Sequence, residues 1–134
     1  MSVIKKGNTV KEKVFCKTWG PVRSTHQHAI KANGFLFSTV CGYDSEGKTV
    51  SGGVEAQTKQ LMENMKSLLS GESLTLDDVV DITVFIKDHS DFAKMNDIYY
   101  SYFPLTTPMR ACIEVCWLAD DLLVEMKMMA ALKE

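Results

Sequence analysis

The 134-residue sequence lacks an excess of charge of either sign, because 15 lysines and arginines stand against 17 aspartates and glutamates, a formal net charge of −2. Proteins that bind nucleic acid carry basic patches that neutralise phosphates, so neither RNA nor DNA is an expected partner. The sequence also lacks an apolar run near the ~20 residues that span a bilayer. No apolar segment follows the lysines near its N-terminus, so no signal peptide is predicted. We therefore expect a cytoplasmic protein with no membrane partner.

Cysteine is scarce, and its spacing is unlike that of a disulfide framework or a metal site. The four residues are Cys16, Cys41, Cys112 and Cys116, with no C-x-x-C pair. On one strand, Cys112 and Cys116 would lie roughly 13 Å apart, which is too far for a disulfide. We therefore expect four reduced thiols in a cytosol-like compartment. With 46% hydrophobic residues, the chain is long enough to bury the core of one domain, residues 1–134.

The stretch from Pro108 to Trp117 alternates apolar and polar residues, which predicts a strand. We expect the apolar positions to face the core: Met109, Ala111, Ile113, Val115 and Trp117. The polar positions then lie on the opposite face: Arg110, Cys112, Glu114 and Cys116. Arg110 lies near the start of the strand, which Pro108 sets because proline cannot donate to a ladder. Its guanidinium could bind a carboxylate ligand through two hydrogen bonds or form an ion pair with Glu114.

The N-terminal third is predicted from composition and from one turn. Residues 1–13 are polar and basic, and we expect a loosely held lead-in there. A short edge strand is predicted over residues 14–17. The dipeptide Asn33-Gly34 predicts a tight turn, because both positions tolerate a positive φ, and so predicts a hairpin over residues 29–40.

Two helices and two further strands are predicted downstream. They are a helix over residues 54–70, a strand over 79–87, a helix from the N-cap Ser90 to Pro104, and a strand over 122–131. The first helix has one apolar stripe, and Gly71 is expected to close it in the C-cap position. On the strand over 79–87, one face is expected to carry Val80, Ile82, Val84 and Ile86, and the other Asp81, Thr83 and Phe85.

Elements in this order predict an α+β fold with a single mixed β-sheet and two helices packed on one face. Two helices can cover only one side of such a sheet. The uncovered face would carry Arg110 and Glu114 together with Asp81 and Phe85, a mixture that suits neither solvent nor core. We therefore expect this face to form a subunit interface with clefts in it.

Short motifs from about Ser24 to Ala131 carry a resemblance to a known family. They are Gln57-Thr58, Glu63-Asn64-Met65-Lys66, Asp78-Val79-Val80, Thr83-Val84-Phe85, Asp91-Phe92-Ala93 with Asn96, Tyr102-Phe103, Pro108 to Val115, and Val124-Glu125-Met126. Each motif alone is weak, but in this order and at this spacing the chain resembles the Rid/YjgF family of reactive-intermediate deaminases. The resemblance implies a fold similar to that of the small trimeric chorismate mutases.

The resemblance also implies a homotrimer with active sites between subunits. Members with Pro-x-Arg at this place hydrolyse 2-imino acids such as 2-iminopropanoate and 2-iminobutanoate, or the enamines that give rise to them, to 2-keto acids and ammonia. The expected catalytic residues are Arg110, which would bind the substrate carboxylate, and Glu125, which would position or deprotonate water. The expected substrate-binding residues are Arg110, Cys112, Asn96, Thr39 and His26. Neither a metal nor a cofactor is expected, because an imine is already electrophilic.

The chain departs from the family pattern beside the expected pocket. The family usually has Gly-Pro-Tyr-Ser before the hairpin, and counting back without gaps places His26 at the tyrosine. A four-residue insertion would instead match Gly20-Pro21 to the Gly-Pro and Val22 to the tyrosine. Thr39-Val40 stands where Ser-Gly is customary. The remaining departures are Met109 and Lys127. The resemblance therefore leaves the pocket's size and its substrate open.

Other functions and other roles for these residues stay open. Some relatives have been described as endoribonucleases or translation inhibitors, and a trimer that binds small carboxylates without turnover is a third possibility. His26 and His28 could belong to a zinc site, although no third ligand at metal spacing is evident. Cys112 could be an activated thiolate or a small residue that lines the pocket. Glu125 could form an ion pair with Lys127 instead of handling water.

Overall fold

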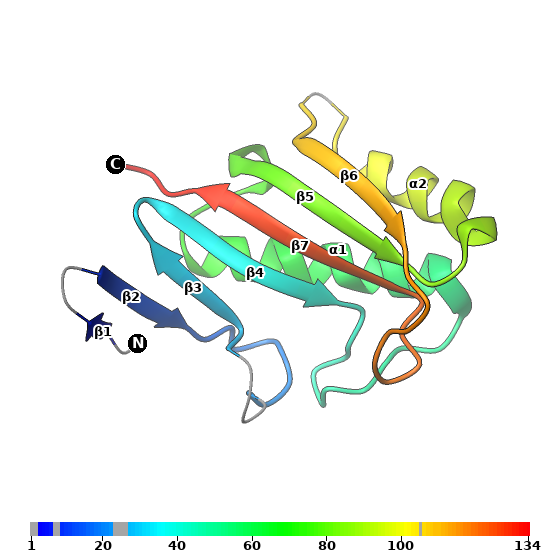
Figure 1. Cartoon of the computed structure of the whole chain (residues 1–134), viewed down its shortest axis with the longest axis horizontal. Helices are drawn as coiled ribbons and strands as arrows, with labels where there is room; N and C mark the ends of the chain where they lie inside the picture. Colours follow the sequence, from blue (N-terminus) through cyan, green and yellow to red (C-terminus); the bar gives the residue numbers. More distant parts are fainter. Residues whose placement is uncertain (1–2, 7–8, 23–26, 105) are drawn as a thin grey trace.

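The computed structural model describes residues 3–6, 9–22, 27–104 and 106–134 of the chain. The strands are β1 (Val3–Lys6), β2 (Thr9–Val14), β3 (Ala29–Ala32), β4 (Phe35–Cys41), β5 (Val79–Ile86), β6 (Met109–Glu114) and β7 (Val124–Ala131). The helices are α1 (Gly53–Gly71) and α2 (Phe92–Ser101), with short 3₁₀ turns η1 (Leu76–Asp78) and η2 (His89–Asp91). The strands form one sheet in the order β1-β2-β3-β4-β7-β5-β6 (Figure 1). Because β5 and β6 run parallel and the other neighbours antiparallel, the sheet is mixed, as predicted.

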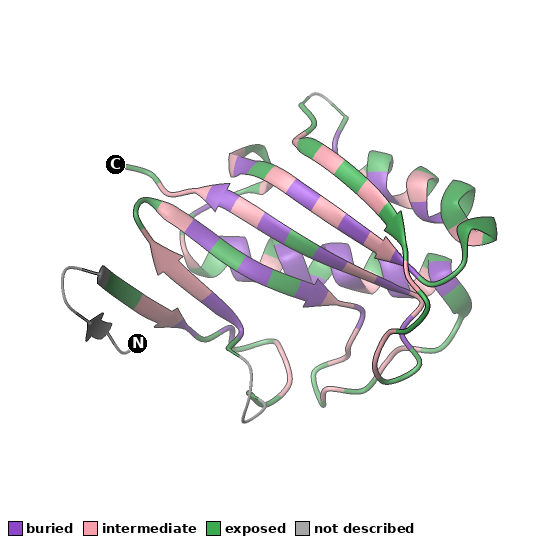
Figure 2. Cartoon of the chain, viewed as in Figure 1, coloured by how far each residue is buried: buried purple, intermediate pink, exposed green. Residues whose placement is uncertain are grey.

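Both helices pack on the same face of the sheet, as predicted (Figure 1). The longer helix, α1, contacts β4, β7 and α2 through its apolar stripe. The central strands consequently alternate between buried residues, which face the helices, and more exposed residues, which face the other way (Figure 2). Neither helix in the described ranges is long and apolar enough to cross a membrane.

One predicted turn is confirmed and another is displaced. Asn33 and Gly34 have φ angles of 51° and 84° and join β3 to β4 as a two-residue hairpin turn. Gly71, predicted as the C-cap of the first helix, is instead its last helical residue. The left-handed residue is Ser73, with a φ of 59°. The later turn brings the next apolar side chain, Leu74, back into the core.

The N-terminal prediction was wrong for the residues that the structure describes there. In place of a loosely held lead-in over residues 1–13, β1 pairs with β2, and β2 pairs with β3. Glu12 lies opposite Lys31, with 3.6 Å between the carboxylate oxygen and the ammonium nitrogen. The predicted edge strand over residues 14–17 is therefore earlier, since β2 ends at Val14. Backbone pairing holds this polar ribbon in place, so the apolar pattern of the sequence gives little sign of it.

The second prediction to need correction concerns the start of β5. A bulge between Val79 and Asp81 shifts the register by one residue. Val79 is therefore buried, whereas Val80, predicted to face the core, is exposed. Beyond the bulge, Ile82 and its alternate neighbours are buried as predicted. A bulge of this kind changes which side chains face the core without changing the sequence pattern around it.

The largest correction concerns the face of β6 that meets the helices. We predicted that the apolar positions would face the core, but they face away from it. In the parallel register Arg110 lies beside Ile82, which is fully buried under the helices. Paired residues of neighbouring strands point to the same face, so Arg110 lies on the helix side. Met109 and Ile113 point the other way and are 70% and 47% exposed.

Alternation with a period of two shows that a strand has two different faces, but not which of them meets the core. The side of the sheet opposite the helices is called the open face below. It carries Phe37, Thr39, Cys41, Asp81, Thr83, Phe85, Met109, Ala111, Ile113, Glu125 and Lys127. The placement of Asp81, Thr83 and Phe85 there is as predicted. Because β6 ends at Glu114, Trp117 lies outside the strand and is 71% exposed.

Candidate active site

Arg110 is held by one face of α2. Its Nη1 donates a hydrogen bond to Asn96 Oδ1 at 2.7 Å. Its Cζ lies 4.6 Å from the ring centroid of Tyr99, 5.3 Å from that of Tyr100 and 5.8 Å from that of Phe92. These α2 residues recur at positions i, i+4, i+7 and i+8, so a single stripe of the helix surrounds the guanidinium. The structure therefore brings together two of the predicted site residues, Arg110 and Asn96.

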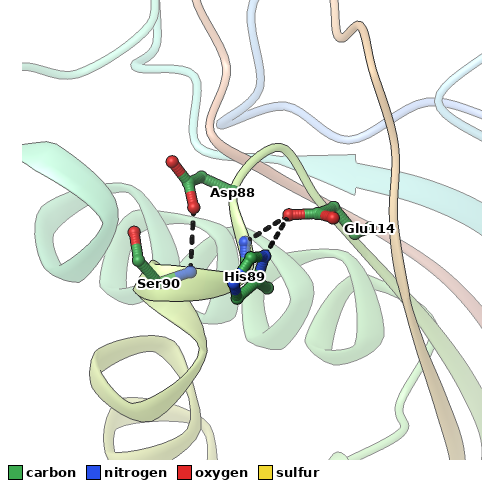
Figure 3. A network of polar contacts seen from close by, with 4 residues as sticks. All are labelled: Asp88, His89, Ser90 and Glu114. Atoms are coloured by element: carbon green, nitrogen blue, oxygen red, sulfur yellow. Dashed lines mark hydrogen bonds and ion pairs between the residues drawn. The ribbon is translucent and has the colours of Figure 1, made fainter.

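In the part of the chain that the structure describes, the Arg110 guanidinium has no carboxylate partner. The alternative that the sequence left open, an ion pair with Glu114, does not form. Glu114 Oε2 instead accepts from the backbone N–H of His89 at 2.7 Å and lies 2.8 Å from its Nδ1 (Figure 3). A guanidinium carries five N–H donors, and the bond to Asn96 uses one. The planar group therefore keeps donors that suit a carboxylate ligand.

The contact between His89 and Glu114 ties the turn before α2 to the end of β6 (Figure 3). Within that turn, the carboxylate of Asp88 accepts from the backbone N–H of Ser90 and caps η2. The N-cap of α2 is Asp91, not the predicted Ser90, and its side chain makes no capping hydrogen bond. The bond to Glu114 raises the pKa of His89, and the bonds from His89 lower the pKa of Glu114. The His89–Glu114 contact therefore joins β6, which carries Arg110, to the start of α2, which carries Asn96.

This exposed pair predicts a pH-dependent contribution to stability. Because the pKa of His89 is raised on folding, the pair stabilises the fold below the ordinary histidine pKa of 6.5. This stabilisation is lost as pH rises through the pKa of His89 in the folded protein. Because the pKa of Glu114 is lowered on folding, the pair also stabilises the fold above the ordinary glutamate pKa of 4.5. This stabilisation is lost as pH falls through the pKa of Glu114 in the folded protein. Glu114→Gln should therefore lower Tm most between about pH 4.5 and 6.5, by a small amount because exposed pairs contribute little.

Thermal denaturation across pH tests this expectation, with Glu46→Gln as the control. Glu46 forms an exposed pair with Lys48, 3.4 Å apart, and involves no histidine. Because the control pair contains no histidine, its effect should be the same at about pH 5.5 and about pH 9. A Tm difference for Glu114→Gln that is equally constant would contradict the assignment.

Cys112 lies on the helix side near Arg110. Its side chain is half-buried and packs against the core. Burial raises the pKa of the Cys112 thiol, and the positive charge of Arg110 offsets only part of that rise. Because the thiolate is the nucleophilic form of cysteine, this environment disfavours an activated thiol. Of the two interpretations that the sequence left open, the structure favours a small residue beside Arg110.

A cavity of about 350 Å³ lies at the open face, beside the C-terminal end of β4 and the start of β7. Two predicted site residues, Thr39 and Glu125, line it. The thiol of Cys41 donates to Glu125 Oε1 at 3.5 Å, and no pair between Glu125 and Lys127 forms among the described residues. Other parts of the wall, which the sequence did not predict, include Trp19, Gly20, His28, Tyr43 and Asn64. The cavity is therefore lined by the carboxylates of Glu125 and Asp44, beside hydroxyl and thiol groups.

Asn64 is the main residue that sequence reasoning missed. It lies in the apolar stripe of α1, and its Nδ2 donates to the carbonyl oxygens of Cys41 at 2.9 Å and Tyr43 at 2.8 Å. The backbone carbonyl oxygen of Asn64 accepts a hydrogen bond from Trp19 Nε1 at 2.9 Å. These bonds attach the end of β4 and the cavity wall to the helix. A polar residue within an otherwise apolar helical stripe was the available signal.

His28 is a structural histidine rather than a ligand. Its Nδ1 accepts from the backbone N–H of Cys16 at 3.0 Å, so its Nε2 carries the proton and donates to the carbonyl oxygen of Gly20 at 2.9 Å. Burial lowers the pKa of His28, which keeps the ring neutral. Both ring nitrogens are occupied, which counts against the zinc site considered for His26 and His28. His26 itself lies outside the described residues.

The described site residues fall into two groups on opposite faces of the sheet. Arg110, Asn96 and Cys112 form an arginine half-site on the helix side. Thr39 and Glu125 belong to a cavity half-site on the open face. The prediction that Arg110 faces the uncovered side was wrong for the reason given for β6. Within one copy of the chain, the two half-sites cannot converge on one small molecule.

Comparison with known proteins shows which family the chain belongs to. The family model described as endoribonuclease L-PSP matches residues 21–132, which include both half-sites. The chain belongs to the Rid/YjgF family. The match confirms the resemblance seen in the sequence, and the Rid/YjgF fold is the mixed sheet with two helices on one face described above.

Three relatives of this Rid/YjgF chain illustrate the range of the family. The chain is 37% identical over 125 residues to a RutC family protein of Pyrococcus horikoshii, covering 90% of this chain and 98% of that one. It is 37% identical over 90 residues to the 2-iminobutanoate/2-iminopropanoate deaminase of Salmonella typhimurium, covering 65% of this chain and 70% of that one. The crystal structure of yeast Mmf1 matches with a TM-score of 0.87 at 29% identity, covering 92% of this chain and 99% of that one. The family therefore includes proteins named as deaminases of reactive imines.

Proposed function

We propose that the protein hydrolyses reactive 2-imino acids, such as 2-iminopropanoate and 2-iminobutanoate, to 2-keto acids and ammonia. The observation that carries the proposal is the Arg110 guanidinium, which Asn96 and three aromatic rings hold in place without a carboxylate partner among the described residues. A planar cation held in this way suits the carboxylate that every 2-imino acid carries. The name of the Salmonella relative refers to the same substrates.

In the proposed reaction, Glu125 handles water while Arg110 holds the substrate. Water adds to the carbon of the C=N bond, and Glu125 accepts the proton that this oxygen loses. That proton is then returned to the nitrogen, which leaves a carbon that carries one hydroxyl and one amino group. Glu125 next passes the hydroxyl proton to the amino group, the C–N bond breaks, and ammonia leaves as the C=O bond forms. One imino acid and one water thus give one 2-keto acid and one ammonia. The imine carbon is already electrophilic, so the step requires neither a metal nor an organic cofactor.

The proposal requires a second copy of the chain, because the two half-sites lie on opposite faces. If Arg110 of one copy faces Glu125 of the next, two different surfaces meet at the interface. Such a heterologous contact, repeated about one rotation axis, closes into a ring rather than a two-fold dimer. The exposed apolar side chains of Met109 and Ile113 on the open face would be covered in such a ring. We therefore propose a homotrimer with active sites between its subunits.

The assembly is tested by light scattering at micromolar concentration. The parent protein should have a mass of about three times the 15.0 kDa of one chain. Ile113→Asp places a charge on the open face and should shift the mass to that of one chain. The control, Lys59→Asp, introduces the same residue on the exposed side of α1 and should leave the trimer intact. A parent protein with the mass of a single chain would reject the shared site.

The activity is tested by generating a 2-imino acid in place with an amino-acid oxidase and trapping it with semicarbazide. A deaminase should suppress the formation of the semicarbazone in proportion to its concentration. Binding of a 2-keto acid without such suppression would instead identify a trimeric regulator. Cleavage of RNA without suppression would support the ribonuclease activity that the family model is named for.

A further inference from the structure

The ring of Tyr99 lies closest to the guanidinium of Arg110. The distance from Arg110 Cζ to the ring centroid is 4.6 Å, shorter than the corresponding distances for Tyr100 and Phe92. A guanidinium over an aromatic face is attracted by the negative charge of the ring face. The geometry therefore gives Tyr99 the strongest contact of the three rings with this cation.

Tyr99 is also the most firmly fixed of these rings. Only 1% of its surface is exposed, compared with 39% for Phe92 and 48% for Tyr100. Its ring contacts that of Phe103 at a centroid distance of 4.9 Å and that of Tyr100 edge-on at 5.4 Å. A ring packed in this way cannot change rotamer without disturbing the core. The ring of Tyr99, held in place by the core, therefore restricts the position of the Arg110 guanidinium.

The hydroxyl group of Tyr99 does not explain why an aromatic residue stands there. It is buried and has no hydrogen-bond partner in the described ranges of the chain. Burial raises the pKa of Tyr99 to about 12, and the charge of Arg110 offsets part of the effect, so the phenol stays neutral. A buried hydroxyl without a partner costs stability. The useful part of the residue is therefore its ring.

We propose that Tyr99 is a positioning residue for Arg110. Its ring holds the guanidinium from one side while Asn96 fixes the rotation through one N–H, so that the remaining donors are presented to a ligand carboxylate. Presetting the group in this way lowers the ordering cost of binding. The inference rests on the proposed function, since it assumes that Arg110 binds the carboxylate of the substrate.

The test replaces Tyr99 with phenylalanine and then with phenylalanine fluorinated at one, two and three ring positions. Fluorination weakens the negative ring face while the shape of the ring changes little. Calorimetric titration of the assembled protein with 2-oxobutanoate should give unchanged affinity for Tyr99→Phe. Affinity should then fall stepwise along the series, by roughly three- to thirtyfold in total, the range of a cation–π contact. Equal affinity along the whole series would overturn the inference.

Two further variants separate positioning from stability. Tyr99→Leu should weaken 2-oxobutanoate binding and raise KM more than it lowers kcat. Phe103→Leu removes another buried ring that contacts Tyr99, and it should lower Tm while weakening binding much less than Tyr99→Leu does. Equal loss of affinity in both variants would show a purely structural role and overturn the inference. If Tyr99→Leu does not fold, the fluorinated series still decides.

Arg110→Ala distinguishes this inference from the proposed function. Loss of 2-oxobutanoate binding in Arg110→Ala, with a flat fluorinated series, would overturn only the role of Tyr99. Normal binding in Arg110→Ala would overturn the carboxylate contact of the proposed function, and this inference with it.

Discussion

Arg110→Lys is expected to lose at least about a hundredfold in kcat/KM for 2-imino acids while the protein still folds and assembles. Lysine keeps the positive charge, but its single ammonium group cannot donate to Asn96 and grip both carboxylate oxygens with a planar pair of N–H groups. It also lacks the flat surface that lies over the ring of Tyr99. The measurement is steady-state suppression of semicarbazone formation, with mass and Tm determined in parallel.

Two other variants define what the loss means. Arg110→Ala should abolish both turnover and the thermal stabilisation that an added 2-keto acid gives to the parent. Lys94→Gln is the matched control, because it removes an exposed cation of α2 that does not contact Arg110, and it should retain full activity. If Arg110→Lys turns over at the parent rate, bidentate recognition of the carboxylate is not the role of this residue.

Glu125→Gln is expected to lower kcat by about a hundred- to ten-thousandfold while leaving 2-keto acid binding intact. Glutamine keeps the size and the hydrogen bonding of glutamate but cannot accept a proton. Removing a negative charge beside an anionic ligand also lowers repulsion, so affinity for the product should be at least that of the parent. Replacement of Glu125 should therefore reduce turnover while binding is retained, whereas replacement of Arg110 should reduce binding as well.

Lys127→Gln is the control for Glu125→Gln. Lys127 lies two positions along β7 on the same open face, but it does not line the cavity. Its replacement should leave kcat unchanged, so a general effect of altered charge on this face can be separated from the loss of a base. Normal turnover by a Glu125→Gln trimer that binds product would make Glu125 structural, and His26 would then be the next group to test.

Much of the fold could be predicted because local chemistry specifies it. Asn33 and Gly34 accept positive φ angles that few other pairs tolerate, so the hairpin between β3 and β4 follows from two residues. The apolar stripe of α1 has a helical period, which identifies both the element and its buried side. The polar ribbon of β1 and β2 has no comparable signal, since backbone pairing with β3 determines its place.

The identity of the candidate site residues was also available from the sequence. The Pro108–Arg110 motif, together with the other motifs between Ser24 and Ala131 in their order and spacing, was sufficient to recognise the family. The strand predicted over residues 122–131 contains β7, in which Glu125 and Lys127 share one face. The way in which the cavity walls come together could not be predicted from the sequence, because Trp19 and Asn64 meet only after β4 has packed against α1.

The sequence by itself determined the two helices, the strands from β3 onward, the family and the candidate residues for the chemistry. Only the tertiary structure decided which face of β6 meets the helices, and hence that Arg110 and Glu125 lie on opposite sides of the sheet. The physical reason is that a period of two defines two faces without naming either. The choice between them depends on pairing with β5 and on the bulge at Val79. These are long-range contacts, and no local stretch of the sequence encodes them.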